Sequence, residues 1–197
     1  APHVIVIAKK VPVDDLKSFI AYAKANPGKL SYGTPGVGTP QHIAGELFCV
    51  LAGIKMEHIP YRGANLTDVM SGVVAVGIQN AGAAMPMVRD GRVRGIGITS
   101  LKRSANAPDL PTVVEAGFPG FEATTWYGLV GPGKMPAAMA QRMNDDVNKV
   151  LAMPDVQEKM ELYGAEDGGG SIQKFADFIK AEQQKWTVVA KAANVKA

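Results

Sequence analysis

The sequence has little cysteine, little histidine and no long hydrophobic run, and each shortage excludes a class of protein. Cys49, the single cysteine among 197 residues, can form no internal disulfide, and we expect it to be a small buried core residue. The three histidines, His3, His42 and His58, do not have the spacing of a metal site. No apolar stretch reaches the roughly 20 residues of a membrane-spanning helix. The net charge is only +3 and Lys and Arg are dispersed, which argues against a nucleic-acid-binding stripe.

The remaining composition is that of a folded globular protein. Hydrophobic residues make up 47% and charged residues 20% of the chain, which fits one large domain or two small ones. The chain opens directly into an apolar strand at Val4–Ile7 without a leader pattern, so we expect a mature, trimmed or truncated product. Strands and helices are predicted to alternate as far as Thr99, which favours a mostly parallel sheet with helices on both faces. The predicted strands cover 4–8, 30–32, 55–59, 73–78 and 93–99, and the predicted helices 14–26, 40–52, 65–71 and 83–89.

The second half of the chain has a different pattern. After a predicted short helix at 112–116 and an extended stretch at 121–130, the sequence past Pro136 is helical, apart from a possible short strand at 164–166. The predicted helices cover 137–151, 154–163 and 171–193, with Ser171 as the cap of the last. Met135, Met139 and Met143 fall on one helical face and are predicted to fill a core.

One stretch, residues 31–42, stands out as a candidate binding loop. It is predicted to be the end of a strand, a glycine-rich turn and the first turn of a helix, in which Thr39 is the N-cap and Pro40 occupies the first helical position. Gly33, Gly36 and Gly38 allow the backbone to bend. The free N–H groups and the dipole of such a helix favour an anion, and we expect a carboxylate there. The predicted buried face of the helix consists of Ile43, Ala44, Leu47, Phe48, Val50 and Leu51.

Nucleotide-binding loops fit this stretch poorly. A phosphate loop needs Gly-Lys-Ser/Thr after its second conserved glycine, but Thr39 and Pro40 follow Gly38. A dinucleotide fingerprint would need a third glycine that is absent. No cofactor is therefore predicted. Two interpretations remain open from spacing alone, a small-anion cradle and a bare strand-to-helix turn.

No catalytic set is visible in the sequence. Ser31 and Ser71 lack the context of a nucleophile elbow, and Cys49 is predicted to lie away from any activating charge. We therefore expect a protein that is not an enzyme.

A series of motifs resembles a known family. Pro-Gly-Lys-Leu-Ser-Tyr-Gly at 27–33, Gly-Thr-Pro-Gln-His-Ile-Ala-Gly-Glu-Leu-Phe at 38–48 and His-Ile-Pro-Tyr-Arg-Gly at 58–63 resemble the solute-binding receptors of tripartite tricarboxylate transporters, the Bug family. Further motifs follow in the same order at 99–104, 109–117, 119–122 and 126–129. The resemblance implies a type II periplasmic-binding-protein fold, in which two α/β lobes with mostly parallel sheets close on a small carboxylate or amino acid. It also implies an exported, periplasmic protein that delivers its ligand to membrane permease subunits.

The resemblance also implies a division of the chain and a missing part. Residues 1–124 resemble the second lobe, with the ligand loop at 31–42, and residues 125–197 resemble the returning C-terminal part of the first lobe, one strand plus helices. The family's opening third has no counterpart here, so one lobe is complete, the other is partly present, and one of two anion cradles is found. The apolar faces of the helices after Pro136 are then expected to need a partner, a swapped copy or a rearranged packing.

The resemblance further implies a set of ligand-binding residues. The second-lobe loop would hold a carboxylate through backbone N–H groups and a hydroxyl, His42 would either reach the ligand or cap and pack the loop, and two side chains at a strand end would be donors in the cleft. These residues are Thr34, Gly36, Val37, Gly38, Thr39, His42, Gln79 and Asn80. Ala75 and Gln79 stand where family members carry acidic residues, which favours a plain organic acid, such as a di- or tricarboxylate, over an amino acid.

Other positions are expected to be structural. Arg62 is interpreted as a solvated arginine, His58 as a structural residue, and Trp126 and Tyr127 as packing at the crossover between lobes. The leading hypothesis is an exported receptor that captures a small organic carboxylate by lobe closure. The alternatives are the ligand-sensing domain of a transcription regulator and a small carboxylate-acting enzyme.

Overall fold

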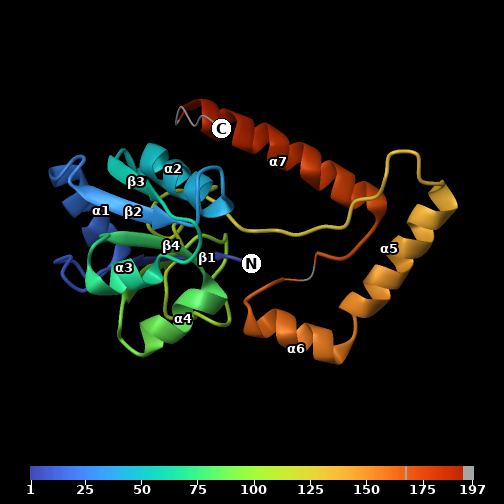
Figure 1. The fold of residues 1–197 in the computed structure, drawn as a ribbon, viewed down its shortest axis with the longest axis horizontal. Helices are drawn as coiled ribbons and strands as arrows, with labels where there is room; N and C mark the ends of the chain where they lie inside the picture. Colours follow the sequence, from blue (N-terminus) through green and yellow to red (C-terminus); the bar gives the residue numbers. More distant parts are fainter. Residues whose placement is uncertain (167, 193–197) are drawn as a thin grey trace.

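The structure is a computed structural model that describes residues 1–166 and 168–192 (Figure 1). It consists of an α/β part, formed by the first half of the chain, and a tail of helices formed by the second half. Residues 193–197 lie outside the described residues. They include the predicted end of the last helix, at residue 193, and the end of the predicted C-terminal part of the first lobe, at residue 197.

The α/β part is built on one five-stranded sheet with the order β3-β2-β4-β1-β5. Its strands are β1 (His3–Ile7), β2 (Leu30–Thr34), β3 (Met56–Pro60), β4 (Val76–Asn80) and β5 (Arg94–Ile98). β2 pairs in parallel with both β3 and β4, whereas β1 is antiparallel to both of its neighbours, β4 and β5. Four of the five strands therefore point the same way, which confirms the predicted mostly parallel sheet. The sequence did not indicate that β1 runs against them from an interior position.

Helices cover both faces of this sheet, as predicted. They are α1 (Leu16–Ala25), α2 (Pro40–Ala52), α3 (Leu66–Ser71) and α4 (Ala81–Arg89). Gly45 of α2 lies against Ile78, whereas Val69 of α3 lies against Gly77. Gly77 and Ile78 are neighbours in β4, and adjacent strand residues point to opposite faces, so α2 and α3 lie on opposite sides of the sheet. α1 shares the face of α2, because the Phe19 ring stacks on Phe48 with centroids 6.4 Å apart.

Two short segments differ from the prediction in this part of the chain. The strand expected from residue 73 begins at Val76, and Val73 is 72% exposed in the turn before it. Residues 112–116 form turns instead of a helix, with Thr112 in an isolated parallel bridge to Ile98. Regular pairing of β4 begins at Val76 because its partner there is Ile7, the last residue of β1.

The extended stretch 121–130 leaves the α/β part beside the strand where the chain begins. The Ala1 ammonium donates to the Thr125 carbonyl at 2.8 Å, the Thr125 N–H donates to the Ala1 carbonyl at 2.9 Å, and Pro2 forms an antiparallel bridge with Thr124. Beyond that bridge, the described residues after 124 contain no strand, so the strands expected near 126–130 and 164–166 do not form.

The tail consists of α5 (Ala137–Leu151), α6 (Pro154–Leu162) and α7 (Ile172–Ala192), close to the predicted bounds. α5 and α6 bury none of their residues, and Met139 and Met143 are 54% and 48% exposed. The prediction that these methionines fill a core is therefore wrong for this chain, because no element within residues 1–166 and 168–192 covers their face. α7 instead returns over α2, where Val189 is 7% exposed and Trp186 packs against the core (Figure 1).

Candidate functional site

The predicted binding loop lies where β2 ends and α2 begins. The Thr39 hydroxyl accepts from the His42 N–H at 3.4 Å and donates to the Gly36 carbonyl at 2.8 Å, which confirms Thr39 as the N-cap. Gly38 has φ +75°, a left-handed conformation that favours glycine. Val37 is 53% exposed, so the turn opens to solvent and packed side chains do not occlude it.

Most polar groups of the loop are engaged within it. The Gly38 N–H donates to Nδ1 of His42 at 3.0 Å, and the Gly36 N–H donates to the Thr34 hydroxyl at 3.4 Å. Thr34 is fully buried, so its hydroxyl faces the loop interior and not the opening. Within the described residues, the N–H groups of Val37 and Gln41 have no hydrogen-bond partner. These two amides are therefore the donors that the loop leaves for a ligand.

Two stacked histidines contact the loop, His42 at Gly38 and His58 at Thr34. His42 and His58 lie with ring centroids 3.8 Å apart and an interplanar angle of 13°, and Nε2 of His58 lies 2.6 Å from the Thr34 hydroxyl. Nε2 of His42 is 3.7 Å from the Glu46 carboxylate, which also accepts from the Tyr32 hydroxyl. The two rings thus form one support for the loop, in which His42 is buried and His58 is half-buried. His58 was expected to be structural, and His42 was left open between ligand contact and packing.

The electrostatics of this cluster favour neutral rings. Burial lowers the pKa of His42, and the Glu46 carboxylate offsets part of this effect. Burial and, to a lesser extent, the neighbouring His42 lower the pKa of His58 to about 4. Burial and the hydrogen bond to Glu46 raise the pKa of Tyr32 above its usual range. Near neutral pH both rings of the pair are therefore uncharged.

Gln79 lies at the predicted strand end, but its amide is already bound. Its side chain is 8% exposed, and Nε2 donates to Oδ1 of Asn65. Asn65 is the N-cap residue of α3 but makes no side-chain cap hydrogen bond, because its side chain turns inward to Gln79. A Cβ at Gly33 would come within 2.5 Å of Nδ2 of Asn65, which explains the glycine at this strand position.

Asn80 lies next to the loop and is partly exposed. Its Oδ1 accepts from Nε2 of Gln41 at 3.1 Å, so the side chain joins the end of β4 to the first turn of α2. Gln41 is the functional candidate that the sequence reasoning missed. Its place directly after Pro40 at the N-terminus of the helix was the signal that could have indicated it.

The predicted buried face of α2 needs one correction. Ala44 and Phe48 are buried, as predicted, whereas Val50 and Leu51 are each 46% exposed. The helix buries Gly45 and Ala52 in their place because the 3.6-residue repeat turns the last apolar pair away from the sheet.

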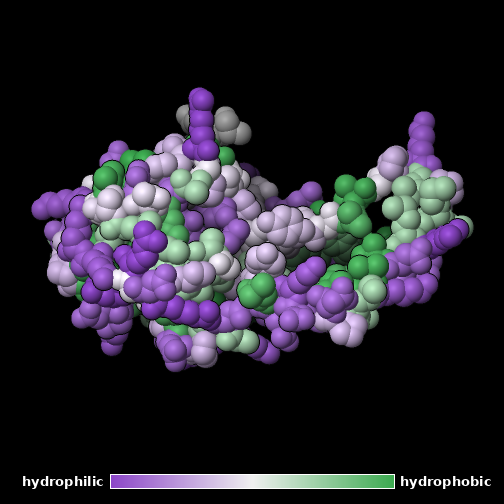
Figure 2. Space-filling model, turned by 60° about the horizontal axis from the view of Figure 1, so that its bottom comes forward, coloured by the Kyte–Doolittle hydropathy of each residue, from purple (hydrophilic) through white to green (hydrophobic). Residues whose placement is uncertain are grey.

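A cavity of about 1510 Å³ lies outside the loop. Asn80 is the one predicted site residue that lines it, together with residues of the extended stretch and of the tail helices. Figure 2 shows hydrophobic residues gathered around the hollow between the α/β part and the tail. Its volume exceeds the roughly 300–1,000 Å³ of small-molecule pockets, so we do not take it as the ligand site.

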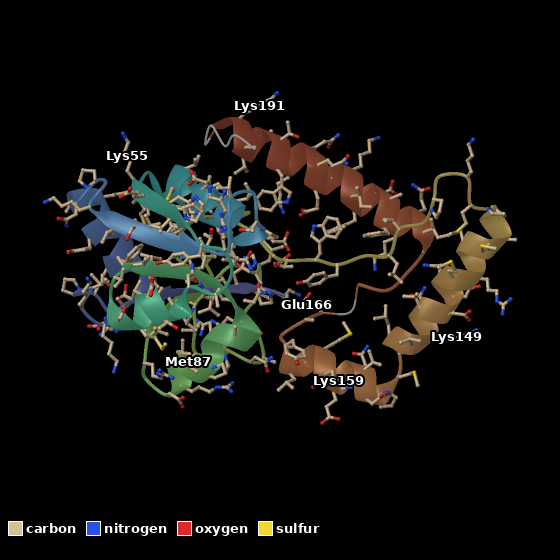
Figure 3. The ribbon with its side chains drawn as sticks, in the orientation of Figure 1. Lys55, Met87, Lys149, Lys159, Glu166 and Lys191 are labelled. Atoms are coloured by element: carbon tan, nitrogen blue, oxygen red, sulfur yellow. The ribbon has the colours of Figure 1, made fainter. Side chains whose placement is uncertain are left out.

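Two of the tail helices, α5 and α6, extend away from the α/β part, whereas α7 packs against α2. Figure 3 shows Lys149 on α5 and Lys159 on α6, away from the part of the molecule that carries Lys55 and Met87. Trp126, at the predicted crossover, packs edge-on against Phe175 and Phe178 of α7, with ring centroids 5.9 Å and 5.3 Å away.

Two other predictions, for Tyr127 and Arg62, have different outcomes. Tyr127, expected to pack at the crossover, is 86% exposed. Arg62 is exposed, in keeping with a solvated arginine.

The described residues offer no site for a metal or a reactive thiol. They contain no group of three or more His, Cys, Asp or Glu residues placed to hold a metal ion. Cys49 is half-buried, less than predicted, and burial raises the pKa of its thiol to about 12. No helix among the described residues has the length and apolarity to cross a membrane.

A largely parallel sheet whose strands end at a glycine-rich turn and a helix N-terminus is an arrangement that many anion-binding α/β proteins use. Comparison with known families narrows this class. Residues 1–195 match the family model described as "Tripartite tricarboxylate transporter family receptor", and the chain belongs to this family. The resemblance seen in the motifs is thereby confirmed, and the family is one of receptors rather than of enzymes.

Known relatives support this assignment. The chain is 31% identical to protein BugT of Bordetella pertussis over 197 residues. This match covers 99% of the chain and 60% of BugT. The structure of Rhodopseudomonas palustris Rpa4515 with adipate has a TM-score of 0.87 and 33% identity, covering 98% of this chain and 66% of that one. MatC from the same organism with bound malate has a TM-score of 0.82 and 26% identity, and the match covers 95% of this chain and 66% of MatC.

These likenesses confirm the predicted periplasmic-binding-protein fold. They also show that the chain spans about 56–60% of the length of the first two curated relatives that it matches.

Proposed function

We propose that the chain is part of a periplasmic solute-binding receptor that captures a small organic carboxylate for the permease subunits of a tripartite tricarboxylate transporter. The observation that carries the proposal is the solvent-open turn before α2, which leaves the Val37 and Gln41 N–H groups without partners at the positive end of the helix dipole. The chain belongs to the receptor family, and two structural relatives hold adipate and malate, which are small carboxylates.

The chemistry of the loop suits a carboxylate without an amino group. The partner-free N–H groups and the Asn80 amide are uncharged groups that can donate to carboxylate oxygens. At the strand end, Gln79 is an amide that already donates to Asn65, and it provides no negative charge for a ligand ammonium. This favours a plain organic acid over an amino acid. Thr34, Gly36, Gly38 and Thr39 then shape the loop.

We assign residues 1–124 to the second lobe and residues 125–197 to the returning part of the first. Residues 1–2 and 124–125 run side by side, so the chain enters and leaves the α/β part at one place. This chain leaves about one third of the length of the solved relatives unmatched. The exposed faces of α5 and α6, and the cavity beside them, fit a lobe whose remaining part lies in that unmatched third. Two such lobes would close on the ligand. A ligand that binds the closed arrangement more tightly than the open one would stabilise the closed state.

The test replaces Gly38 by proline in the full-length receptor. Proline cannot adopt the φ of +75° at this position and has no N–H to donate to His42. We expect the Gly38→Pro variant to stay folded and to lose binding of adipate and malate, measured by isothermal titration calorimetry. Unchanged affinity would show that the loop is not the site.

A matched pair of alanine variants separates loop shape from backbone strain. Gly38 and Gly53 lie at opposite ends of α2 with φ +75° and +63°, and a Cβ at either position would meet no atom within 4 Å. Alanine in this left-handed region costs about 1 kcal/mol at each. Gly38→Ala should weaken binding, whereas Gly53→Ala should not. Equal effects on affinity would contradict the proposed site, and no affinity of the wild type for small di- and tricarboxylates would contradict the ligand class.

A further inference from the structure

The His42 side chain sets the shape of the ligand loop through one hydrogen bond. Its Nδ1 accepts from the Gly38 N–H at 3.0 Å, so this nitrogen carries no proton. The proton of the neutral ring is then on Nε2, which lies 3.7 Å from the Glu46 carboxylate. The ring is 6% exposed. The tautomer of His42 is thus defined by the loop on one side and by Glu46 on the other.

His58 connects the other end of the loop to the same pair. Its ring stacks on His42, and its Nε2 lies 2.6 Å from the hydroxyl of Thr34, which in turn donates to the Gly36 carbonyl. The two imidazoles therefore contact the loop at Thr34 and at Gly38. They act on the backbone on both sides of Val37.

Few charged groups face this pair. α2 contributes Glu46 and, one turn further on, Cys49, and β2 contributes Tyr32, whose hydroxyl donates to Glu46. α7, which packs against α2, carries Glu182, and its carboxylate is bound by Lys185 and by the indole of Trp186. Among these groups, Glu46 is the one that interacts electrostatically with His42, and its carboxylate favours the protonated ring while burial opposes it.

Protonation of His42 is incompatible with the observed loop. A proton on Nδ1 would point at the Gly38 N–H, and two donors cannot share a hydrogen bond. The charge would also lie against the stacked His58 ring, which could not be protonated at the same time without repulsion at 3.8 Å. The Gly38 amide would have to turn away, and the turn between Thr34 and Thr39 would change with it.

We propose that His42 is a positioning residue that couples ligand binding to pH: the neutral His42–His58 pair holds the loop in its binding shape, and protonation of His42 releases the Gly38 amide and the ligand. This inference rests on the proposed function, because it concerns the same loop. Acid would then weaken binding through protonation of His42, in addition to any protonation of the ligand itself.

The first measurement needs neither a variant nor a ligand. In the full-length receptor, NMR spectra of ¹⁵N-labelled protein follow the His42 ring nitrogens and the Gly38 amide as pH is lowered from neutral. We expect the neutral His42 ring to carry its proton on Nε2, and the Gly38 amide shift to titrate together with the ring. A proton on Nδ1 at neutral pH, or a Gly38 amide that does not follow His42, would overturn the inference.

The second measurement compares pH profiles of binding. Adipate and malate affinities are measured for the wild type and for His42→Asn, whose side-chain oxygen can accept from Gly38 near the position of Nδ1 but does not titrate. Below the pKa of His42 the wild-type affinity should fall by up to about tenfold per pH unit beyond the fall in the variant. The ratio between the two profiles is the readout, and it cancels protonation of the acid itself.

The outcomes separate the inference from the proposed function. Parallel profiles for the two proteins would overturn the inference and leave the carboxylate-binding function in place. Failure of the wild type to bind either acid at any pH would count against the function, and the NMR titration would still decide whether His42 controls the loop.

Discussion

Replacement of Gly45 by alanine in the full-length receptor tests the packing that holds α2 and its loop on the sheet. A Cβ at Gly45 would lie 2.5 Å from Cε2 of Tyr32 and 2.9 Å from Cδ1 of Ile78. Both side chains are fully buried, at 0% and 1% exposure. The Tyr32 ring cannot swing aside freely, because its hydroxyl donates to Glu46 on the same helix.

Two opposing effects set the size of the change. Alanine favours the helix over glycine by about 1 kcal/mol. Overpacking a filled core costs about 1–3 kcal/mol, and loss of the Tyr32–Glu46 hydrogen bond costs roughly 1 kcal/mol more. The steric effect outweighs the propensity effect, so we expect Gly45→Ala to lower the free energy of unfolding by about 1–3 kcal/mol. The shifted helix should also weaken binding of the small carboxylate that we propose as the ligand.

The assay is urea unfolding followed by far-UV circular dichroism, with calorimetry for adipate. Gly133→Ala is the control, since a Cβ at Gly133 would meet no atom within 4 Å and the residue is exposed. It should leave stability unchanged within about 0.5 kcal/mol. A Gly45→Ala protein as stable as the wild type, or more stable, would refute the close contact between α2 and the sheet.

Two further predictions concern acid stability and the tail. Burial lowers the pKa of His3 from 6.5 to about 4, so below pH 6.5 the unfolded state takes up a proton that the native state refuses. The unfolding free energy should then fall by up to about 3 kcal/mol between pH 6.5 and pH 4, and less in His3→Gln; equal slopes in urea titrations would contradict this role. The bare faces of α5 and α6 should make the 197-residue chain bind an apolar dye or self-associate, unlike the full-length receptor. A monomeric chain that binds no dye in fluorescence and light-scattering measurements would argue against our assignment of the tail.

Local sequence signals accounted for the elements that depend on a few neighbouring residues. Thr39 and Pro40 defined the start of α2, and Gly53, with its left-handed conformation, defined its end. The tail helices were predicted with nearly correct bounds because their caps and periodicity need no partner. The motif order identified the family, because motifs that extend along the whole chain are specific in combination.

Tertiary structure decided which of those elements meet and what their side chains do there. Three features join residues that are distant in the sequence. They are the antiparallel pairing of β1, the hydrogen bond from Gln79 to Asn65 and the stacking of His42 on His58. A cap or a turn is determined within about four residues by backbone sterics and hydrogen bonds. The partner of a strand or a buried ring depends instead on how the whole sheet assembles, and that assembly left the methionines of α5 bare although their spacing was that of a core face.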